Sequence, residues 1–321
     1  MRFLRKVSTG LVALSISLVI LCYLLVPYSV LAASTNISNK VQTNTPHGFL
    51  QQGIAHLQQN NYADAIADFT QAIQDREGIA TAFSNRCLAY LQIDNYANAI
   101  ADCTQAISSN SHNVEPYLNR GLAYFRTGNY QAAIADYDAM LQLAPNDLRG
   151  YYNRGLAQLG QGEYKNAIAD YDKAIVLIHN VGQSDKQSID SLSEISADIY
   201  TDRGIAKFML VDASEAIADF SEAITLDNQN ARAFFNRGCA YHRQHLFVNA
   251  IADFTISLQL DPHNPDAYMG RAIAQHNQGR DREAVQDLQI AASEFLAKGE
   301  DRSSRHALDL LHQLQQKTIF T

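Results

Sequence analysis

The sequence predicts an all-α fold in which helical hairpins stack into a solenoid, and three observations support this. The string Ala-Ile-Ala-Asp recurs at steps of 34 residues, apart from one longer step, with its isoleucine at Ile66, Ile100, Ile134, Ile168, Ile217 and Ile251, and Val285 in a degenerate copy. A second string, Asn-Arg-Gly or a near variant, recurs upstream in the same register. Turn residues lie between the two strings, with apolar residues at helical spacing on either side. Since helices of about 13 residues are marginal alone, each hairpin must bury its apolar face against its neighbours.

The first 33 residues have the layout of a secretory segment. Arg2, Arg5 and Lys6 precede an uncharged run that begins at residue 7 and includes an apolar stretch over residues 11–26. Val30 and Ala32 then satisfy the small-residue rule for cleavage. We expect residues 1–33 to be either a signal peptide cleaved after Ala32 or an uncleaved membrane anchor, because residues 11–33 could also span a bilayer. Attachment to the membrane would then run through residues 7–33. Both alternatives export the rest of the chain across the cytoplasmic membrane and predict a periplasmic or extracytoplasmic protein.

Composition bounds the remainder of the chain. Residues 34–45 are polar and are expected to form a flexible linker. The chain is 47% apolar and 18% charged, so it can bury a sizeable core and should fold. The formal net charge is −8, and Lys and Arg alternate with Asp and Glu along the chain. We therefore expect no nucleic acid as a partner, because a basic stripe is needed to displace counterions from phosphates.

Seven hairpins are expected over residues 46–298. The irregular step, from Ile168 to Ile217, is 49 residues long, so 15 extra residues near 182–196 separate the fourth and fifth hairpins. These residues are polar and rich in serine, and a loop is expected there. Residues 299–318 are expected to form a helix that covers the end of the last hairpin.

The repeats resemble the tetratricopeptide repeat (TPR). The family's aromatic residue near the start of the first helix is matched in all seven repeats, by Phe49, Phe83, Tyr117, Tyr151, Tyr200, Phe234 and Tyr268. Its small residue at the helix crossing is matched by Gly53, Gly121, Gly155, Gly204 and Gly238, and the aromatic residue facing it by Phe69, Tyr137, Tyr171, Phe220 and Phe254. Cys87 and Ala272 depart from the small-residue column. The resemblance, to a bacterial exported type, implies a right-handed α-solenoid of seven TPR helical hairpins with a C-terminal capping helix.

The same resemblance implies that the first helices line a concave groove for a protein or peptide partner. The residues predicted to contact that partner are Asn85, Asn119, Asn153, Asn236, Leu118, Tyr152, Phe235 and Met269. Side-chain amides both donate and accept hydrogen bonds, so a column of them could hold an extended peptide. The alternative is that the asparagines only stabilise the hairpins. The charged clamp of the chaperone-tail-binding relatives is absent, which favours a hydrophobic or extended ligand.

Two charged columns predict a ladder of structural salt bridges. Seven Asp residues share one column and six Arg residues another, and the first repeat lacks the Arg. Pairing each Asp with the Arg of the following repeat gives six pairs and leaves Asp287 free. The predicted pairs are Asp68–Arg86, Asp102–Arg120, Asp136–Arg154, Asp170–Arg203, Asp219–Arg237 and Asp253–Arg271. Regular repetition is what a structural role requires, so we do not expect these carboxylates to form an acid–base array.

Cys87 and Cys103 are expected to face each other. Both lie at the crossing of the second hairpin, where other repeats have glycine and an aromatic residue. An oxidising compartment would favour a disulfide between them, and the alternative is a pair of buried thiols.

No motif for catalysis is found, so no enzymatic activity and no cofactor are expected. Cys239 and His242, with His276 one repeat further on, could resemble soft-metal ligands, although steps of three residues drift around a helix. The predicted function is therefore an exported scaffold or adaptor that binds a segment of a partner protein in its concave groove. The alternatives are a metal or cofactor carrier that uses Cys239, His242 and His276, and an accessory subunit of an enzyme complex.

Overall fold

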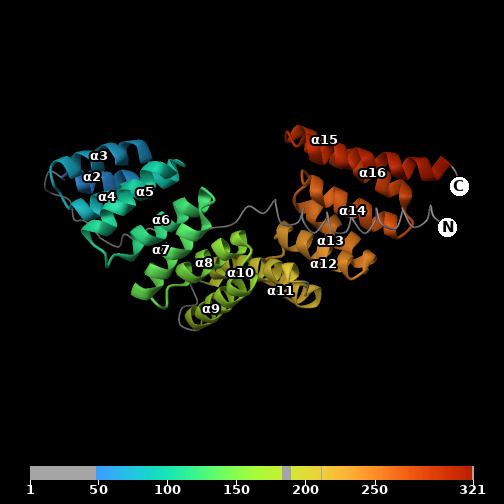
Figure 1. Ribbon diagram of the computed structural model, residues 1–321, viewed down its shortest axis with the longest axis horizontal. Helices are drawn as coiled ribbons and strands as arrows, with labels where there is room; N and C mark the ends of the chain where they lie inside the picture. The colour runs from blue at the N-terminus through green and yellow to red at the C-terminus, as the bar shows by residue number, and fades with distance from the viewer. Residues whose placement is uncertain (1–47, 183–188, 211, 320–321) are drawn as a thin grey trace. The chain divides into compact units, whose positions relative to one another are not determined.

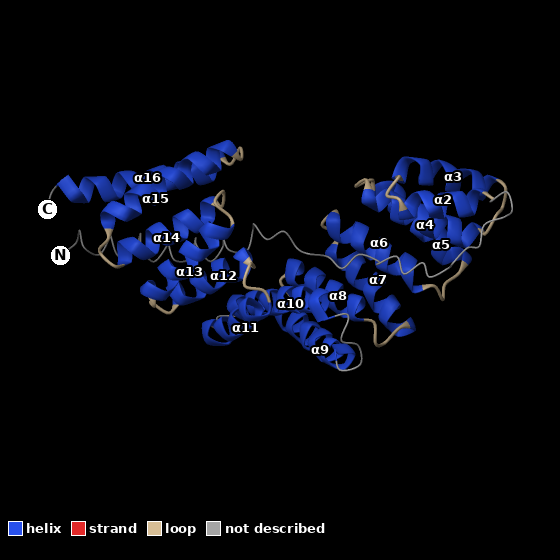
Figure 2. Ribbon diagram, turned by 180° about the vertical axis from the view of Figure 1, so that it is seen from behind, coloured by secondary structure: helices blue, strands red, loops and turns tan. Residues whose placement is uncertain are grey.

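The computed structural model describes residues 48–182, 189–210 and 212–319, and these residues fold as helices joined by short turns (Figure 2). The helices are α2 (Phe49–Gln58), α3 (Tyr62–Gln74), α4 (Ile79–Gln92), α5 (Tyr96–Ser109), α6 (Val114–Arg126), α7 (Tyr130–Leu143), α8 (Leu148–Gln161), α9 (Tyr164–Gly182), α10 (Ile189–Met209), α11 (Ala213–Leu226), α12 (Ala231–Arg243), α13 (Phe247–Leu260), α14 (Pro265–Asn277), α15 (Asp281–Ala297) and α16 (Asp301–Ile319). The predicted export segment, residues 1–33, and the predicted linker, residues 34–45, lie outside the described residues. Over the ranges that are described, no helix is both long enough and apolar enough to cross a membrane.

The helices pair into hairpins as the 34-residue period predicts. The pairs run from α2–α3 to α14–α15, and α16 packs on α15 as a capping helix (Figure 1). The chain divides into two compact units, whose described parts are residues 48–181 and 182–319. In the first unit each helix from α2 to α8 contacts the next, and in the second the same holds from α10 to α16. The first helices of successive hairpins also contact one another within each unit, as α4 contacts α6 and α12 contacts α14. The all-α solenoid prediction is confirmed.

Local sequence explains where the second helices begin. Asn95 and Asn129 precede α5 and α7, and the side chain of each accepts a hydrogen bond from the backbone N–H three residues later, in Asn98 and Ala132. Each bond satisfies one of the free N–H groups at a helix start. Before Asn129, Gly128 has φ 76°, a conformation that glycine adopts at little cost. The tight turn therefore sets the angle at which the two helices of a hairpin meet.

Shape complementarity holds each hairpin closed. A Cβ atom added to Gly121 would lie 2.6 Å from Cε1 of Tyr137, and one added to Gly53 would lie 2.6 Å from Cε1 of Phe69. Both aromatic rings are fully buried. Only glycine therefore leaves room for the facing ring, which explains the pairing of small and aromatic residues across the repeats.

The 15 extra residues near 182–196 are not all a loop, which corrects the prediction. They lengthen α9 to 19 residues and α10 to 21, and α10 begins at Ile189. Ile189, Leu192 and Ile195 recur every three residues and continue to Ile199, which is fully buried. Apolar spacing of this kind favours a helix, and it outweighs the turn tendency of the serines between these positions.

Candidate partner-binding surface

Each arginine of the repeated column pairs with the aspartate of its own hairpin. Nε and Nη2 of Arg86 donate to the two carboxylate oxygens of Asp102 at 2.6 and 2.8 Å. The same two-pronged geometry recurs in Arg120–Asp136, Arg154–Asp170, Arg203–Asp219, Arg237–Asp253 and Arg271–Asp287. The residues of the predicted ladder are therefore paired, but the predicted partners, such as Asp68 for Arg86, are wrong, and Asp287 is not free.

The first repeat has no arginine in this column, but its aspartate has another partner. Asp68 accepts a bond from Nδ1 of His56 at 2.7 Å, so it does not need the arginine of the next repeat. The first helix of a hairpin lies directly against its own second helix, so an arginine in the middle of the first reaches the aspartate 16 residues later. Two-pronged pairs of this kind orient both helices because the guanidinium and carboxylate are planar.

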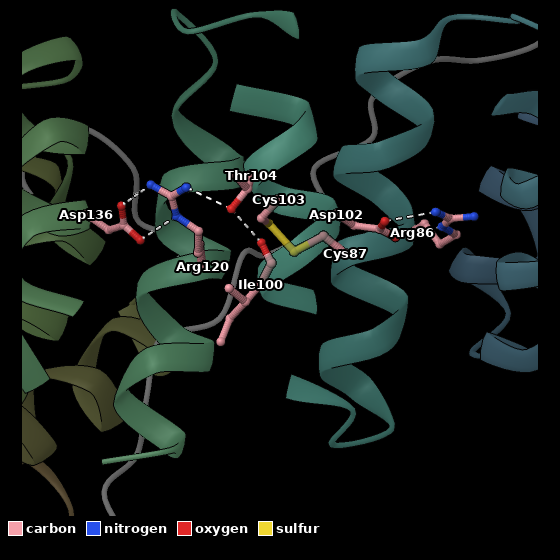
Figure 3. Close-up of a disulfide and its surroundings, with 8 residues drawn as sticks. All are labelled: Arg86, Cys87, Ile100, Asp102, Cys103, Thr104, Arg120 and Asp136. Carbon is pink, nitrogen blue, oxygen red and sulfur yellow. Dashed lines mark hydrogen bonds and ion pairs between the residues drawn. A yellow bond between two sulfur atoms is a disulfide. The ribbon is translucent and has the colours of Figure 1, made fainter. Parts of the chain in front are cut away.

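The link between repeats is made by the third guanidinium nitrogen. Nη1 of Arg120 donates to Oγ1 of Thr104 in the preceding hairpin at 3.0 Å, and Thr104 in turn donates to the carbonyl oxygen of Ile100 (Figure 3). The equivalent acceptors are Thr70 for Arg86, Asp138 for Arg154, Ser221 for Arg237 and Thr255 for Arg271. Burial raises the pKa of Asp136, and the bonds from Arg120 oppose that rise. A ladder therefore exists, in which arginine side chains are linked to the preceding repeat mostly through hydrogen bonds to hydroxyl groups.

Cys87 and Cys103 form a disulfide in the structure, with their Cα atoms 5.4 Å apart (Figure 3). Both residues are fully buried and lie in one cluster with Leu91, Ala99 and Leu122. The disulfide joins α4 to α5 at the crossing where the third hairpin has Gly121 against Tyr137. A covalent bond here replaces the packing of a ring on a glycine.

Most of the predicted groove residues are buried inside the stack. Asn119, Asn153 and Asn236 are only 1–3% exposed, and Leu118, Tyr152, Phe235 and Met269 are buried as well. Nδ2 of Asn236 donates to the carbonyl oxygen of Arg232 one turn earlier, which is a stabilising role within the helix. Of the eight residues, Asn85 alone is half-buried. The predicted set is therefore not an open contact surface in this structure, and Tyr152 and Phe235 instead pack on Tyr171 and Phe254 of the second helices.

Polar residues near the ends of the first helices remain accessible instead. Thr81 and Arg126 are exposed, in α4 and α6. Arg149 of α8 bonds Glu115 of α6, one repeat earlier, at 2.8 Å, and also bonds Asp147. The spacing of 34 residues between Glu115 and Arg149 could have revealed this pair from the sequence. The pair shows that equivalent residues of successive first helices lie side by side within the unit.

In the second unit the corresponding pair is Arg232 with Asp198, also 34 residues apart. Their charged groups lie 3.8 Å apart, and Arg232 makes a closer bond to the fully buried Asp202 at 2.9 Å. One repeat further, Asp266 is buried, and burial raises its pKa to about 7. Charged residues therefore follow the same column of first helices in both units.

The proposed metal ligands have other contacts. Nε2 of His242 lies 3.0 Å from Nδ2 of Asn277, and Nδ1 of His276 bonds Asp281 at 2.6 Å. Burial and, as a smaller effect, the neighbouring His245 together lower the pKa of His242 to about 4. Among the residues that the structure describes, no three His, Cys, Asp or Glu side chains form a group that could hold a metal ion. The geometry thus gives no support to the carrier alternative.

Comparisons with known proteins agree on the repeat. A family model described as tetratricopeptide repeat matches residues 50–114, 118–183 and 235–299, which together make up more than half of the chain. A second model with the same description matches residues 87–147, and one described as TPR repeat matches residues 212–244. No curated protein matches the chain.

Solved structures share the fold at low sequence identity. A tetratricopeptide repeat protein from Parabacteroides merdae has a TM-score of 0.60 and 17% identity, over 80% of this chain and 97% of that one. The protein pilF of Pseudomonas aeruginosa has a TM-score of 0.56 and 14% identity, over 72% and 99%. The C-terminal part of a TPR repeat-containing protein from Cytophaga hutchinsonii has a TM-score of 0.53 and 15% identity, over 83% and 95%. From the matching family model and these shared folds, the chain belongs to the tetratricopeptide-repeat family.

Proposed function

We propose that this protein is a scaffold or adaptor that binds a segment of a partner protein along the first helices of its hairpins. The observation that carries the proposal is the register of those helices. Glu115 and Arg149, one repeat apart, meet at 2.8 Å, so equivalent positions form a continuous column over α6 and α8. An extended segment could follow such a column with one contact per repeat. The tetratricopeptide-repeat fold is generally a non-enzymatic scaffold for protein interactions, which supports this function.

The proposed contact surface is the accessible part of the first helices. It includes Thr81 of α4, Glu115 and Arg126 of α6, and Arg149 of α8, together with the half-buried Asn85. The buried asparagines and apolar residues beneath would fix the geometry of this surface and would not touch the partner. The proposed surface thus lies on the first helices, as the sequence predicts, but it uses their accessible residues in place of the buried ones.

A crosslinking experiment tests the location. The full chain would be used to select peptides from a displayed library, and variants with a photoreactive phenylalanine at Thr81 or Arg126 would then be irradiated with the selected peptide. Crosslinks at these positions, and none from the exposed Asn98 of the second helix α5, are expected. If the library yields no binder, or if crosslinks form only at Asn98, the proposal fails.

We also propose that the protein works outside the cytoplasm, delivered by residues 1–33 and either released or held at the membrane by residues 7–33. The disulfide between Cys87 and Cys103 supports an oxidising compartment. Fractionation of cells that produce the tagged chain, with N-terminal sequencing of the mature protein, distinguishes the two forms. A mature N-terminus at Ala33 indicates cleavage, an intact chain in membranes indicates an anchor, and an intact chain in the cytoplasm contradicts export.

A further inference from the structure

Arg243, the last residue of α12, differs from the other half-buried arginines. Eight arginines in the described ranges are half-buried and bonded to a carboxylate: Arg86, Arg120, Arg149, Arg154, Arg203, Arg232, Arg237 and Arg271. Arg243 is half-buried too, yet no carboxylate of the described residues pairs with it. Burial lowers its pKa, and no acidic neighbour offsets this effect. Partial burial of an unpaired charge is costly, so its retention requires an explanation.

The guanidinium of Arg243 is held in place by neutral contacts. Its central carbon lies 4.2 Å from the centre of the Phe208 ring in α10, and Nη1 donates to the carbonyl oxygen of Phe208. This stacking fixes the plane of the group and leaves Nε and Nη2 without a bond inside the described part of the molecule. A guanidinium that is fixed in this way, with two free N–H donors on one edge, is suited to bind a carboxylate through two hydrogen bonds.

The surroundings of Arg243 include exposed apolar side chains and a neutral histidine. His242 is uncharged at neutral pH, since its pKa is lowered to about 4 by burial and by His245. Leu210 follows α10 and is 40% exposed, while Leu246 and Val248 follow Arg243 closely and are 44% and 63% exposed. Nε2 of Gln244 donates to Oγ of Ser214 at 2.8 Å, which ties the turn after α12 to the start of α11. The turn after α12 therefore lies next to the start of α11.

From these contacts we propose that Arg243, Phe208, Leu210, Leu246 and Val248 form a docking surface, called here the Arg243 surface, for a partner segment that carries one carboxylate flanked by apolar side chains. The proposal rests on the proposed scaffold function and names the chemistry of its partner. The carboxylate would accept two bonds from Nε and Nη2, and the apolar neighbours would cover the leucines and the valine. A strongly acidic segment is not the expected partner, because the protein itself has a net charge of −8.

Two peptides test the surface directly. Both are blocked at their ends and have glycine and serine tails around Leu-Val-Glu-Leu-Val in one and Leu-Val-Gln-Leu-Val in the other, so glutamate is the single carboxylate. Fluorescence anisotropy with the full chain should give about tenfold tighter binding of the glutamate peptide, as expected for a charge-assisted two-pronged bond. The Arg243→Met variant should bind both peptides equally, at the affinity of the glutamine peptide. The Leu246→Ser variant should weaken both.

Control variants separate docking from folding. Arg282→Met removes an exposed arginine of α15 in the same unit and should leave both affinities unchanged. In urea unfolding, Arg243→Met should be as stable as the parent protein or more stable, because an uncompensated charge is removed. A loss of stability equal to that of Arg237→Met, which deprives Asp253 of its partner, would instead make Arg243 a structural residue and overturn the proposal.

The binding outcomes also distinguish this inference from the scaffold function. Equal affinity of the two peptides, undiminished binding by Arg243→Met, or no binding of either peptide overturns the Arg243 surface. The scaffold function survives each of these results if the displayed library still yields peptides that crosslink to the first helices. An empty library contradicts both.

Discussion

Removal of the disulfide tests the view that the Cys87–Cys103 bond substitutes for a ring packed on glycine. The cysteines are 16 residues apart, and a closed loop of this length restricts the unfolded chain by about 3 kcal/mol. The Cys87→Ala/Cys103→Ala variant loses that restriction and leaves space at the fully buried crossing. The Cys87→Gly/Cys103→Tyr variant loses the restriction too, but it recreates the pair seen at Gly121 and Tyr137. Burial of the new ring should recover about 1.5–3 kcal/mol.

Urea unfolding under non-reducing conditions should therefore rank the parent protein first, the Gly/Tyr variant second and the Ala/Ala variant last. Hydrogen exchange should show the loss in α4 and α5, since neighbouring repeats are stabilised mainly by their own interfaces. Helical circular dichroism before unfolding checks that each variant is folded. Equal stability of the Gly/Tyr and Ala/Ala variants would refute the reasoning, because the crossing would then not select for shape.

Three further changes test the repeat architecture. Arg237→Met should destabilise the second unit by about 2–4 kcal/mol in urea unfolding, because it leaves the buried Asp253 unpaired, and Asp253→Leu in the same chain should restore most of the loss. Gly121→Ala should lower stability by about 1–2 kcal/mol despite alanine's better helix propensity, since its Cβ would meet the buried Tyr137 ring; a stabilised variant would contradict the crossing geometry. Burial raises the folded-state pKa of Asp266 to about 7, so folding favours its protonated form and stability should fall as pH rises from about 4 to 7. The Asp266→Asn variant should flatten this part of the pH–stability profile, and an unchanged profile would exclude Asp266 as the cause.

The repeated features were predictable from the sequence because the same residue types recur at equivalent positions of successive repeats. The spacing from Ile66 to Ile100 predicts the hairpin period, and the glycine column predicts the crossing that Gly121 and Tyr137 make. Cys87 and Cys103 could be placed opposite each other because they interrupt two columns at the same crossing. Position within a repeat was therefore sufficient to infer which side chains meet inside one hairpin.

Pairing and exposure could not be predicted in the same way. A period of 34 residues does not distinguish the Arg86–Asp102 pair within a hairpin from an Asp68–Arg86 pair between hairpins, and the histidine that serves Asp68 lies in a different column. Exposure also differs between equivalent positions of different repeats. Asn119 and Asn85 occupy the same column, but the first is buried and the second half-buried.

A repetitive chain makes its exceptions informative, because each column supplies the expected residue. Where a column is obeyed, as at Arg237 with Asp253, the side chains satisfy one another and have a structural role. Arg243 lies outside the column of paired arginines, keeps an unpaired charge beside Phe208, and is followed by exposed leucine and valine side chains. Folding alone does not favour that combination, since methionine would pack on Phe208 without the cost of burying a charge. The Arg243→Met variant therefore tests whether this departure from the repeat takes part in partner recognition, in addition to the accessible column along the first helices.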